Sequence, residues 1–271
     1  MEEHVSPITQ FVNHYLGGFA LALLHALHIS PEDSQLPIPQ HVVMGVLVLL
    51  LVTILALILR SRLSVEKPGA VQQAAELLIT NPLGFGIRDI LDENVPHGGR
   101  KFIPMVGSIG IFVLFANLFG LFPLFASPTG HVSVPLACAT VTFFYFNWQG
   151  IRYHGPGGYL KHFAGPVWWM SPLIFPVEII STAARVLSLT VRLYANILSS
   201  DLIYVLFLGL LTQVFTWGWD KSPVLGIAMG IFPAIIPLLF VVLHIFVAFV
   251  QAFIFTILPS VYLGMATADE H

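Results

Sequence analysis

The chain has 271 residues, of which 56% are hydrophobic and only 9% are charged. Soluble domains carry about 25% charged residues, so this composition excludes an ordinary soluble protein and indicates several membrane helices. The formal net charge of −3 gives no reason to expect a nucleic-acid partner. The single cysteine, Cys138, excludes an intrachain disulfide.

The first segment, residues 1–39, is expected to lie outside the membrane. No Lys or Arg precedes Arg60, so the segment lacks the basic region with which a signal peptide begins. Its apolar stretch Phe11–Ile29 is interrupted by histidines that lack further ligands at a metal-binding spacing, which favours a surface-lying helix over a metal site. These histidines are His14, His25 and His28.

The second segment, residues 40–166, contains three runs suited to ordinary membrane spans. His41–Leu59 is nearly continuous Val, Leu and Ile over about 20 residues, enough to cross a hydrocarbon core of roughly 30 Å. The second run is Phe102–Leu121 and the third is Val132–Ile151. Together they predict an all-α, polytopic membrane protein.

An interfacial segment joins the first two spans, and the basic residues fix the orientation. Gly69–Ile90 mixes polar and apolar residues, which predicts an amphipathic segment broken near Pro82 and Gly84. By the positive-inside rule, the side that gathers the basic residues is cytoplasmic, so the N-terminus is outside and the C-terminus cytoplasmic. The basic residues are Arg60, Arg62, Lys67, Arg88, Arg100, Lys101, Arg152 and Lys161.

The last segment, residues 167–271, consists of two unusually long apolar runs. Pro172–Phe215 and Pro223–Met265 are separated only by the polar turn Trp217–Ser222. Each run has about 40 residues, or roughly 60 Å as a helix, which is twice the hydrocarbon thickness. The runs therefore predict a hairpin of two long, strongly tilted helices, and such a tilt requires packing against a partner.

Charged residues interrupt the first long run. Glu178, Arg185 and Arg192 are seven residues apart and so form one stripe, whereas Asp201 is rotated by about 180° to the opposite face. A charge at bilayer depth costs from about 2.5 to more than 10 kcal/mol, so these residues are functional candidates. The helix thus has two opposed polar faces, with Arg192 between them.

The hairpin register pairs these charges with polar residues of the second run. Facing residues of an antiparallel helix pair have a constant sum of residue numbers, and two polar pairs fit nearly the same register. They are Arg192 with Gln251 and Asp201 with His244. Gln251 is seven residues from His244, so both lie on one helix face. The register predicts a buried Arg–Gln pair and a buried Asp–His pair at two depths.

Structural explanations remain open for some of these residues. Arg185 is expected to extend to the cytoplasmic interface, and Glu178 is equally suited to a channel and to a structural partnership with Arg185. A single membrane histidine is often a packing residue, but its alignment with Asp201 favours a function for His244. Arg192 has no acidic residue within a turn, which favours function. The sequence has no phosphate-binding loop, nucleophile elbow or HExxH motif, so no catalytic residue, metal or cofactor is expected.

Several motifs, in order, resemble subunit a of F-type ATP synthases. SLTVRLYAN at Ser188–Asn196 contains the Arg-Leu-x-x-Asn of that family. FANLFGLFP at Phe115–Pro123 resembles its Asn-Leu-x-Gly-x-x-Pro span, SPTG at Ser127–Gly130 its following turn, and His244–Leu263 its last helix. The resemblance extends from about Arg60 to the C-terminus.

The chain departs from the family pattern at four positions. Tyr194 and Ala195 stand where Phe and Gly are usual, and Asp201 replaces the commoner Glu or His. Pro259 lies in the last helix, where a local kink is possible.

The resemblance implies a proton-translocating stator subunit in a bacterial inner membrane. Such a subunit offers two offset half-channels to a rotating ring of c subunits, and its further partners are the b subunits of the peripheral stalk, the rest of the complex and lipid. By the same resemblance, Arg192 faces the ring carboxylate and Asn196 lines the same region. Asp201, His244 and Gln251 belong to the outer half-channel or support the arginine, and Glu178 belongs to the cytoplasmic half-channel.

The alternative function is a secondary transporter that binds an anionic substrate at Arg192, near the bilayer midplane. Such transporters are built from inverted repeats and broken helices. The two halves of the sequence show no convincing repeat, which favours the stator subunit.

Overall fold

The computed structural model describes residues 6–26, 28, 36–65, 67–81, 84–95, 98–122, 125–164 and 170–267. Throughout these ranges the regular structure is helical, with no strand. The predicted all-α class is therefore confirmed.

Helix α1 (Pro7–Ala26) forms within the N-terminal apolar stretch and is tied to the chain before α2. The Asn13 amide donates to the Ile38 carbonyl at 3.0 Å and accepts from the Ile38 amide at 2.9 Å. The predicted N-terminal helix is confirmed, and its position relative to a membrane remains a prediction.

Helix α2 (Gln40–Ser61) matches the first predicted span. The interfacial segment forms two helices, α3 (Ala70–Ile79) and α4 (Ile87–Asn94). Between them the Asp89 carboxylate accepts a hydrogen bond from the Asn81 amide at 2.8 Å, which holds the turn. The predicted break in the segment is confirmed; Pro82 lies outside the described residues.

The second predicted span is α5 (Ile103–Phe119), which continues from the short helix η1 (Gly99–Phe102). The turn η2 (Pro128–Gly130) then leads to α6 (Ser133–Ala164), which runs well beyond the predicted end at Ile151. Gly155 interrupts α6 with φ 73° and ψ 162°, a left-handed conformation that glycine adopts readily.

The two long apolar runs are single helices, α7 (Ser171–Lys221) and α8 (Pro223–Thr267). They have 51 and 45 residues, corresponding to about 77 and 68 Å. Near the hairpin turn the two helices approach closely because both have glycine there: a Cβ on Gly218 would lie 2.9 Å from the Gly226 Cα. The two runs form the long, adjacent helices that the sequence predicts, and their tilt in a membrane remains a prediction.

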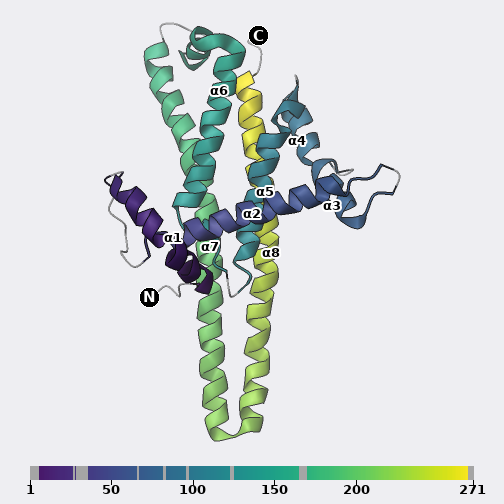
Figure 1. Cartoon of the computed structure of the whole chain (residues 1–271), viewed down its shortest axis with the longest axis vertical. Helices are drawn as coiled ribbons and strands as arrows, with labels where there is room; N and C mark the ends of the chain where they lie inside the picture. Colours follow the sequence, from purple (N-terminus) through teal and green to yellow (C-terminus); the bar gives the residue numbers. More distant parts are fainter. Residues whose placement is uncertain are drawn as a thin grey trace.

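Figure 1 shows how these helices are arranged. α5 packs along α8 and α6 along α7, whereas α2 runs across the direction of the hairpin. The half of the hairpin nearest its turn projects beyond the other helices (Figure 1). The sequence treats three spans as equivalent, but in the structure two of them follow the hairpin and one does not.

Four helical segments of the described chain are long and apolar enough to cross a membrane. They are α2, η1 with α5, α7, and the Leu238–Thr267 part of α8. α6 is not among them, because even its more apolar first half contains polar residues such as Asn147 and Gln149. The third predicted span therefore remains a prediction.

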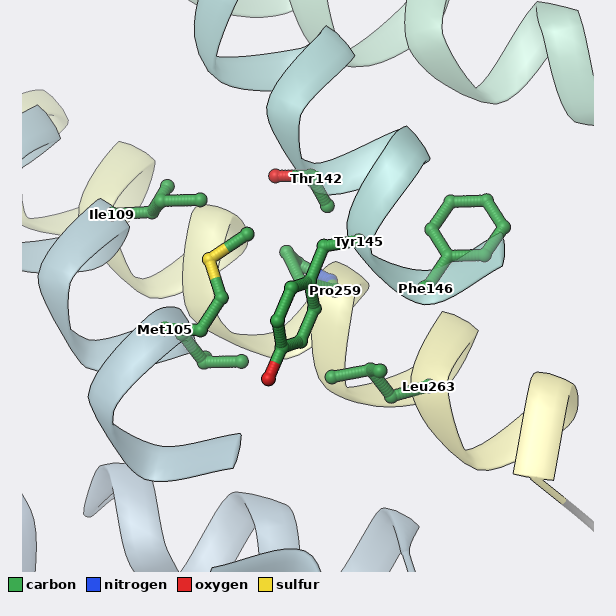
Figure 2. Close-up of a pocket in the computed structure, with 8 residues that line it drawn as sticks. Met105, Ile109, Thr142, Tyr145, Phe146, Pro259 and Leu263 are labelled. Carbon is green, nitrogen blue, oxygen red and sulfur yellow. The ribbon is translucent and has the colours of Figure 1, made fainter. Parts of the chain in front are cut away.

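The core lies where α5, α6, α7 and α8 meet. Leu193 and Ile197 of α7 and Phe255 of α8 are fully buried against α5. Figure 2 shows a neighbouring cavity of about 10 Å³, where Met105 of α5 and Tyr145 of α6 face Pro259 of α8. α8 continues as a helix through Pro259, although proline provides no amide donor for the preceding turn.

Candidate functional site

Arg192 is an exposed residue on α7, and Asn196, one turn later, is exposed as well. Leu189 and Leu193, on the other side of the helix, are buried in the core. Arg192 has no ion pair among the described residues. The chain therefore presents a guanidinium on the exposed, mostly apolar side of a long helix.

His244 of α8 is buried, with 6% of its surface exposed, and both ring nitrogens have partners. Nδ1 lies 2.7 Å from the Ser200 hydroxyl and Nε2 lies 3.1 Å from the Asn117 carbonyl oxygen. Since a carbonyl only accepts, Nε2 carries a proton, and in the neutral ring Nδ1 accepts from Ser200. The predicted register is thus nearly right, but the hydrogen-bond partner of His244 is Ser200 rather than Asp201.

Asn117 connects His244 to the η2 turn. Its Oδ1 accepts from the Thr129 hydroxyl at 2.6 Å, and that hydroxyl lies 2.7 Å from the Ser127 hydroxyl. Ser127 donates in turn to the Ala116 carbonyl at 3.1 Å. The Asn117 Nδ2 is buried and has no hydrogen-bond partner among the described residues. A chain of polar groups therefore runs through the protein between α5, η2 and α8.

Sequence reasoning did not assign a role to Asn117, Thr129 or Ser200. A signal was present, because an asparagine inside an apolar span is costly unless it is hydrogen-bonded. The partners could not be named, since they come from two other elements, η2 and α8.

Asp201 lies beside this polar chain rather than within it. It is an exposed residue of α7, and a Cβ on Gly130 would lie 3.9 Å from its Oδ2 atom. The carboxylate thus lies against the η2 turn and is open to the surroundings. The expectation of a buried Asp201–His244 pair is not met within this chain.

Gln251 is almost completely buried, with 1% of its surface exposed. Its Oε1 atom has no hydrogen-bond partner among the described residues. A buried unpaired acceptor costs about 1–3 kcal/mol, so this side chain is suited to a donor from elsewhere. The predicted buried Arg192–Gln251 pair does not form here, because Arg192 is exposed.

Glu178 and Arg185 form an ion pair of 3.5 Å, and the Arg185 guanidinium lies 5.2 Å from the centre of the Tyr262 ring. The Arg185 side chain is only 20% exposed, so it is held by these partners rather than extended freely to the interface. With Thr182 and other residues these side chains line a cavity of about 30 Å³, large enough for a water molecule.

The site therefore has three parts along α7. The Glu178–Arg185 pair lies toward the start of the helix, and Asp201 with the His244 chain lies further along it. Arg192 lies between them in sequence, on the exposed side of α7. The titratable groups can exchange protons, whereas an arginine stays positively charged across the physiological pH range.

Comparisons with known proteins show the family. A family model described as "ATP synthase A chain" matches residues 42–264. "ATP synthase subunit a" of Koribacter versatilis is 39% identical over 268 residues, which cover 99% of each chain. The protein of the same name from Solibacter usitatus is 38% identical over 259 residues, covering 96% of this chain and 99% of the relative. The chain belongs to the ATP synthase A chain family.

Proposed function

We propose that this protein is the proton-translocating stator subunit of an F-type ATP synthase, with two offset half-channels that serve a rotating ring of c subunits. One observation carries the proposal: an exposed arginine, with no ion pair among the described residues, lies on a long apolar helix between two separate polar regions. The family membership supports it as well.

Arg192 requires an acidic partner from another subunit, because a charge facing lipid is costly. The small residues on its helix face favour close approach by that partner. Ser188, Ala195 and Ser199 lie three, four or seven residues from Arg192 and are exposed. A deprotonated ring carboxylate fits this surface, and a fixed cation there repels a bare proton that would pass directly between the half-channels.

The outer half-channel contains Asp201, His244 and the polar chain through Asn117. The imidazole and the carboxylate both take up and release protons, and the Ser200 hydroxyl, which is hydrogen-bonded to His244, directly precedes Asp201 in the sequence. Gln251 lies on the same face of α8 as His244, two turns further from the hairpin turn. Its side-chain oxygen has no partner among the described residues and is suited to accept a hydrogen bond from Arg192 once the ring has docked.

The cytoplasmic half-channel contains Glu178, and Asn196 lines the region beside Arg192. The small cavity at Glu178 and Tyr262 supports this assignment, because it has room for water beside a titratable group. The Glu178–Arg185 ion pair equally fits a purely structural role for Glu178. The experiment on Arg192 does not depend on which role Glu178 has.

The membrane arrangement follows from the lengths and directions of the helices. If α2 crosses the bilayer, α7 and α8 lie at a shallow angle to the membrane plane, because α2 runs across them (Figure 1). The N-terminus is then outside a bacterial inner membrane and the C-terminus is cytoplasmic. The partners are the c ring, the peripheral-stalk b subunits and lipid, and the chain has no catalytic site of its own. The unbroken α7 and α8 give no support to the alternative of a secondary transporter.

The experiment replaces Arg192. Arg192→Ala removes the barrier and leaves both half-channels, so ATP synthesis by the whole complex is lost while passive proton uptake through the membrane sector persists. Arg192→Lys also fails to couple, because a desolvated ammonium loses its proton more readily than a guanidinium. Both activities are measured in membrane vesicles.

Lys221→Ala, which removes a charge at the hairpin turn of the same helix, is the matched control and is expected to keep both activities. Near-normal ATP synthesis by Arg192→Ala would refute the proposed gate and leave this arginine with a structural role.

A further inference from the structure

Two histidines that the proposed pathway does not use are stacked where α2 begins, beside the η2 turn. The rings of His41 and His131 are parallel to within 1°, and their centroids are 3.9 Å apart. His41 lies in the first turn of α2 and is half-buried, whereas His131 follows η2 and is exposed. The Nδ1 atom of His131 lies 2.8 Å from the Ser133 hydroxyl.

The η2 turn links this stacked pair to the pathway. Gly130, which precedes His131, lies against the Asp201 carboxylate. Thr129, in the same turn, is hydrogen-bonded to Asn117, which accepts from His244. One short turn thus carries an exposed imidazole and also contacts the first titratable group of the proposed outer half-channel.

We infer that His41 and His131 form a proton-collecting site that takes protons from the outer aqueous phase and passes them to Asp201. The inference rests on the proposed function and deepens it. In the first step an imidazole nitrogen gains a proton from hydronium or a buffer acid. In the second step the imidazolium N–H gives its proton to the Asp201 carboxylate. The imidazole returns to its neutral form, so no other reactant is consumed.

The stacked geometry suits this role better than a metal site. The lone pairs of parallel rings point side by side and do not converge on one ion, and the described residues contain no cluster of three or more metal-ligating side chains. Two imidazolium rings at this separation would repel each other, so a pair that has taken one proton takes up a second one less readily. The site therefore loads and releases single protons.

The surroundings contain few competing charges among the described residues. The elements that pack against α2 and η2 here are α1, α5, α6 and α7. The first turn of α6 and the whole of α5 carry no ionisable residue, α1 contributes His14, Tyr15 and His25, and α7 contributes Asp201. Asp201 is thus the acceptor that the geometry offers.

The supply of protons gives the pair its importance. At about pH 8 free protons are near 10⁻⁸ M, so even capture at about 10¹⁰ M⁻¹s⁻¹ delivers only about 10² protons per second. This rate is similar to ordinary enzyme turnover, so a site that collects protons from buffer acids raises the flux when the outer phase is alkaline.

The test uses the whole complex in liposomes whose lumen contacts the outer face of the subunit. ATP synthesis is measured at lumen pH values from about 5.5 to 8. A potassium diffusion potential is adjusted at each pH so that the total proton-motive force stays constant. The variant is His41→Phe with His131→Phe, since phenylalanine preserves ring stacking and cannot carry a proton. The matched control is His14→Phe, which changes an exposed histidine of α1.

The double variant is expected to lose at least about tenfold in rate at high lumen pH and to approach the unmodified complex at low pH. Free imidazole in the lumen should restore the rate at high pH, which a packing defect would not allow. A profile parallel to that of the unmodified complex, or an equal loss at every pH without imidazole rescue, would overturn the inference.

Asp201→Asn in the same liposomes separates this inference from the proposed function. If Asp201→Asn slows synthesis while the histidine variant does not, the collecting site alone is refuted. If Asp201→Asn has no effect at any pH, the proposed outer half-channel is refuted. Should the double variant assemble poorly, His131→Gln is measured per assembled complex against the same two criteria.

Discussion

At the scale of single residues, the positions of Asp201 and His244 show what a helix register can and cannot specify. The hairpin register predicts that these side chains meet, and they do lie at the same level. The structure nevertheless gives the hydrogen bond of His244 to Ser200. Residue numbers predict which residues lie at the same level of a helix hairpin. The side of the helix on which a residue lies rotates by about 100° per residue, so Ser200 and Asp201 lie at nearly the same level but only one of them faces His244.

Asn117 shows a second limit of the sequence at this scale. Its partners are Thr129 on η2 and His244 on α8, which are distant in sequence. Hydropathy marks a polar residue within a span as unusual, yet only the packing of three elements reveals which groups satisfy it.

Asp201 provides a prediction for a single side chain. Asp201→Asn keeps the shape of the side chain and removes a group that exchanges protons, so ATP synthesis should fall by about tenfold to a hundredfold. Assembly should be unaffected, because the carboxylate is exposed in this chain. The assay pairs ATP synthesis with the amount of subunit recovered in the complex. Loss of assembly, or an unchanged rate, would contradict the assigned role.

At the scale of elements, the sequence predicts the hairpin well and α6 less well. The apolar runs of α7 and α8 contain no polar cluster that could divide them, so their continuity follows from composition. α6 extends past Ile151 because Gly155 adopts a positive φ and the helix resumes beyond it. Glycine and proline normally mark the end of a helix, and sequence alone does not show that this helix resumes.

The hairpin closure provides a prediction at this scale. Gly218→Ala places a methyl group 2.9 Å from the Gly226 Cα, and since the obstacle is backbone, the helices must separate. The cost is expected to be about 1–3 kcal/mol, seen as a lower thermal midpoint of the purified complex or less assembled subunit. Gly209→Ala is the control, because its Cβ would meet nothing within 4 Å and alanine favours a helix. Equal stability of the two variants would contradict the close approach.

At the scale of the whole molecule, hydropathy identifies the apolar helices but not their directions. α5 and α6 run beside the hairpin and α2 runs across it, although the sequence predicts an ordinary span at each of the three (Figure 1). The direction of a membrane helix is set by its neighbours, and here the neighbours are two helices much longer than a bilayer is thick. The direction of α2 relative to the hairpin could therefore not be predicted from hydrophobic periodicity.

The tilt provides a prediction for the whole molecule. If all 51 residues of α7 lie within a core of roughly 30 Å, depth changes by only about 0.6 Å per residue, against about 1.5 Å for an upright helix. Spin labels at the exposed positions Leu187, Leu198 and Leu208 report depth through their contact with oxygen and with a water-soluble relaxant. A slope near that of an upright helix would contradict the tilted hairpin.

In the proposed function, the permanent charge of Arg192 also determines how reversible proton translocation can be. A gate that had to lose and regain a proton would have an open state and would need its own cycle of energy input. A guanidinium fixed on α7 presents the same barrier at every moment and from either side. By microscopic reversibility, a subunit of this kind does not favour synthesis over pumping. Under the proposed function, the balance between the proton gradient and the ATP level then decides which way the rotor turns.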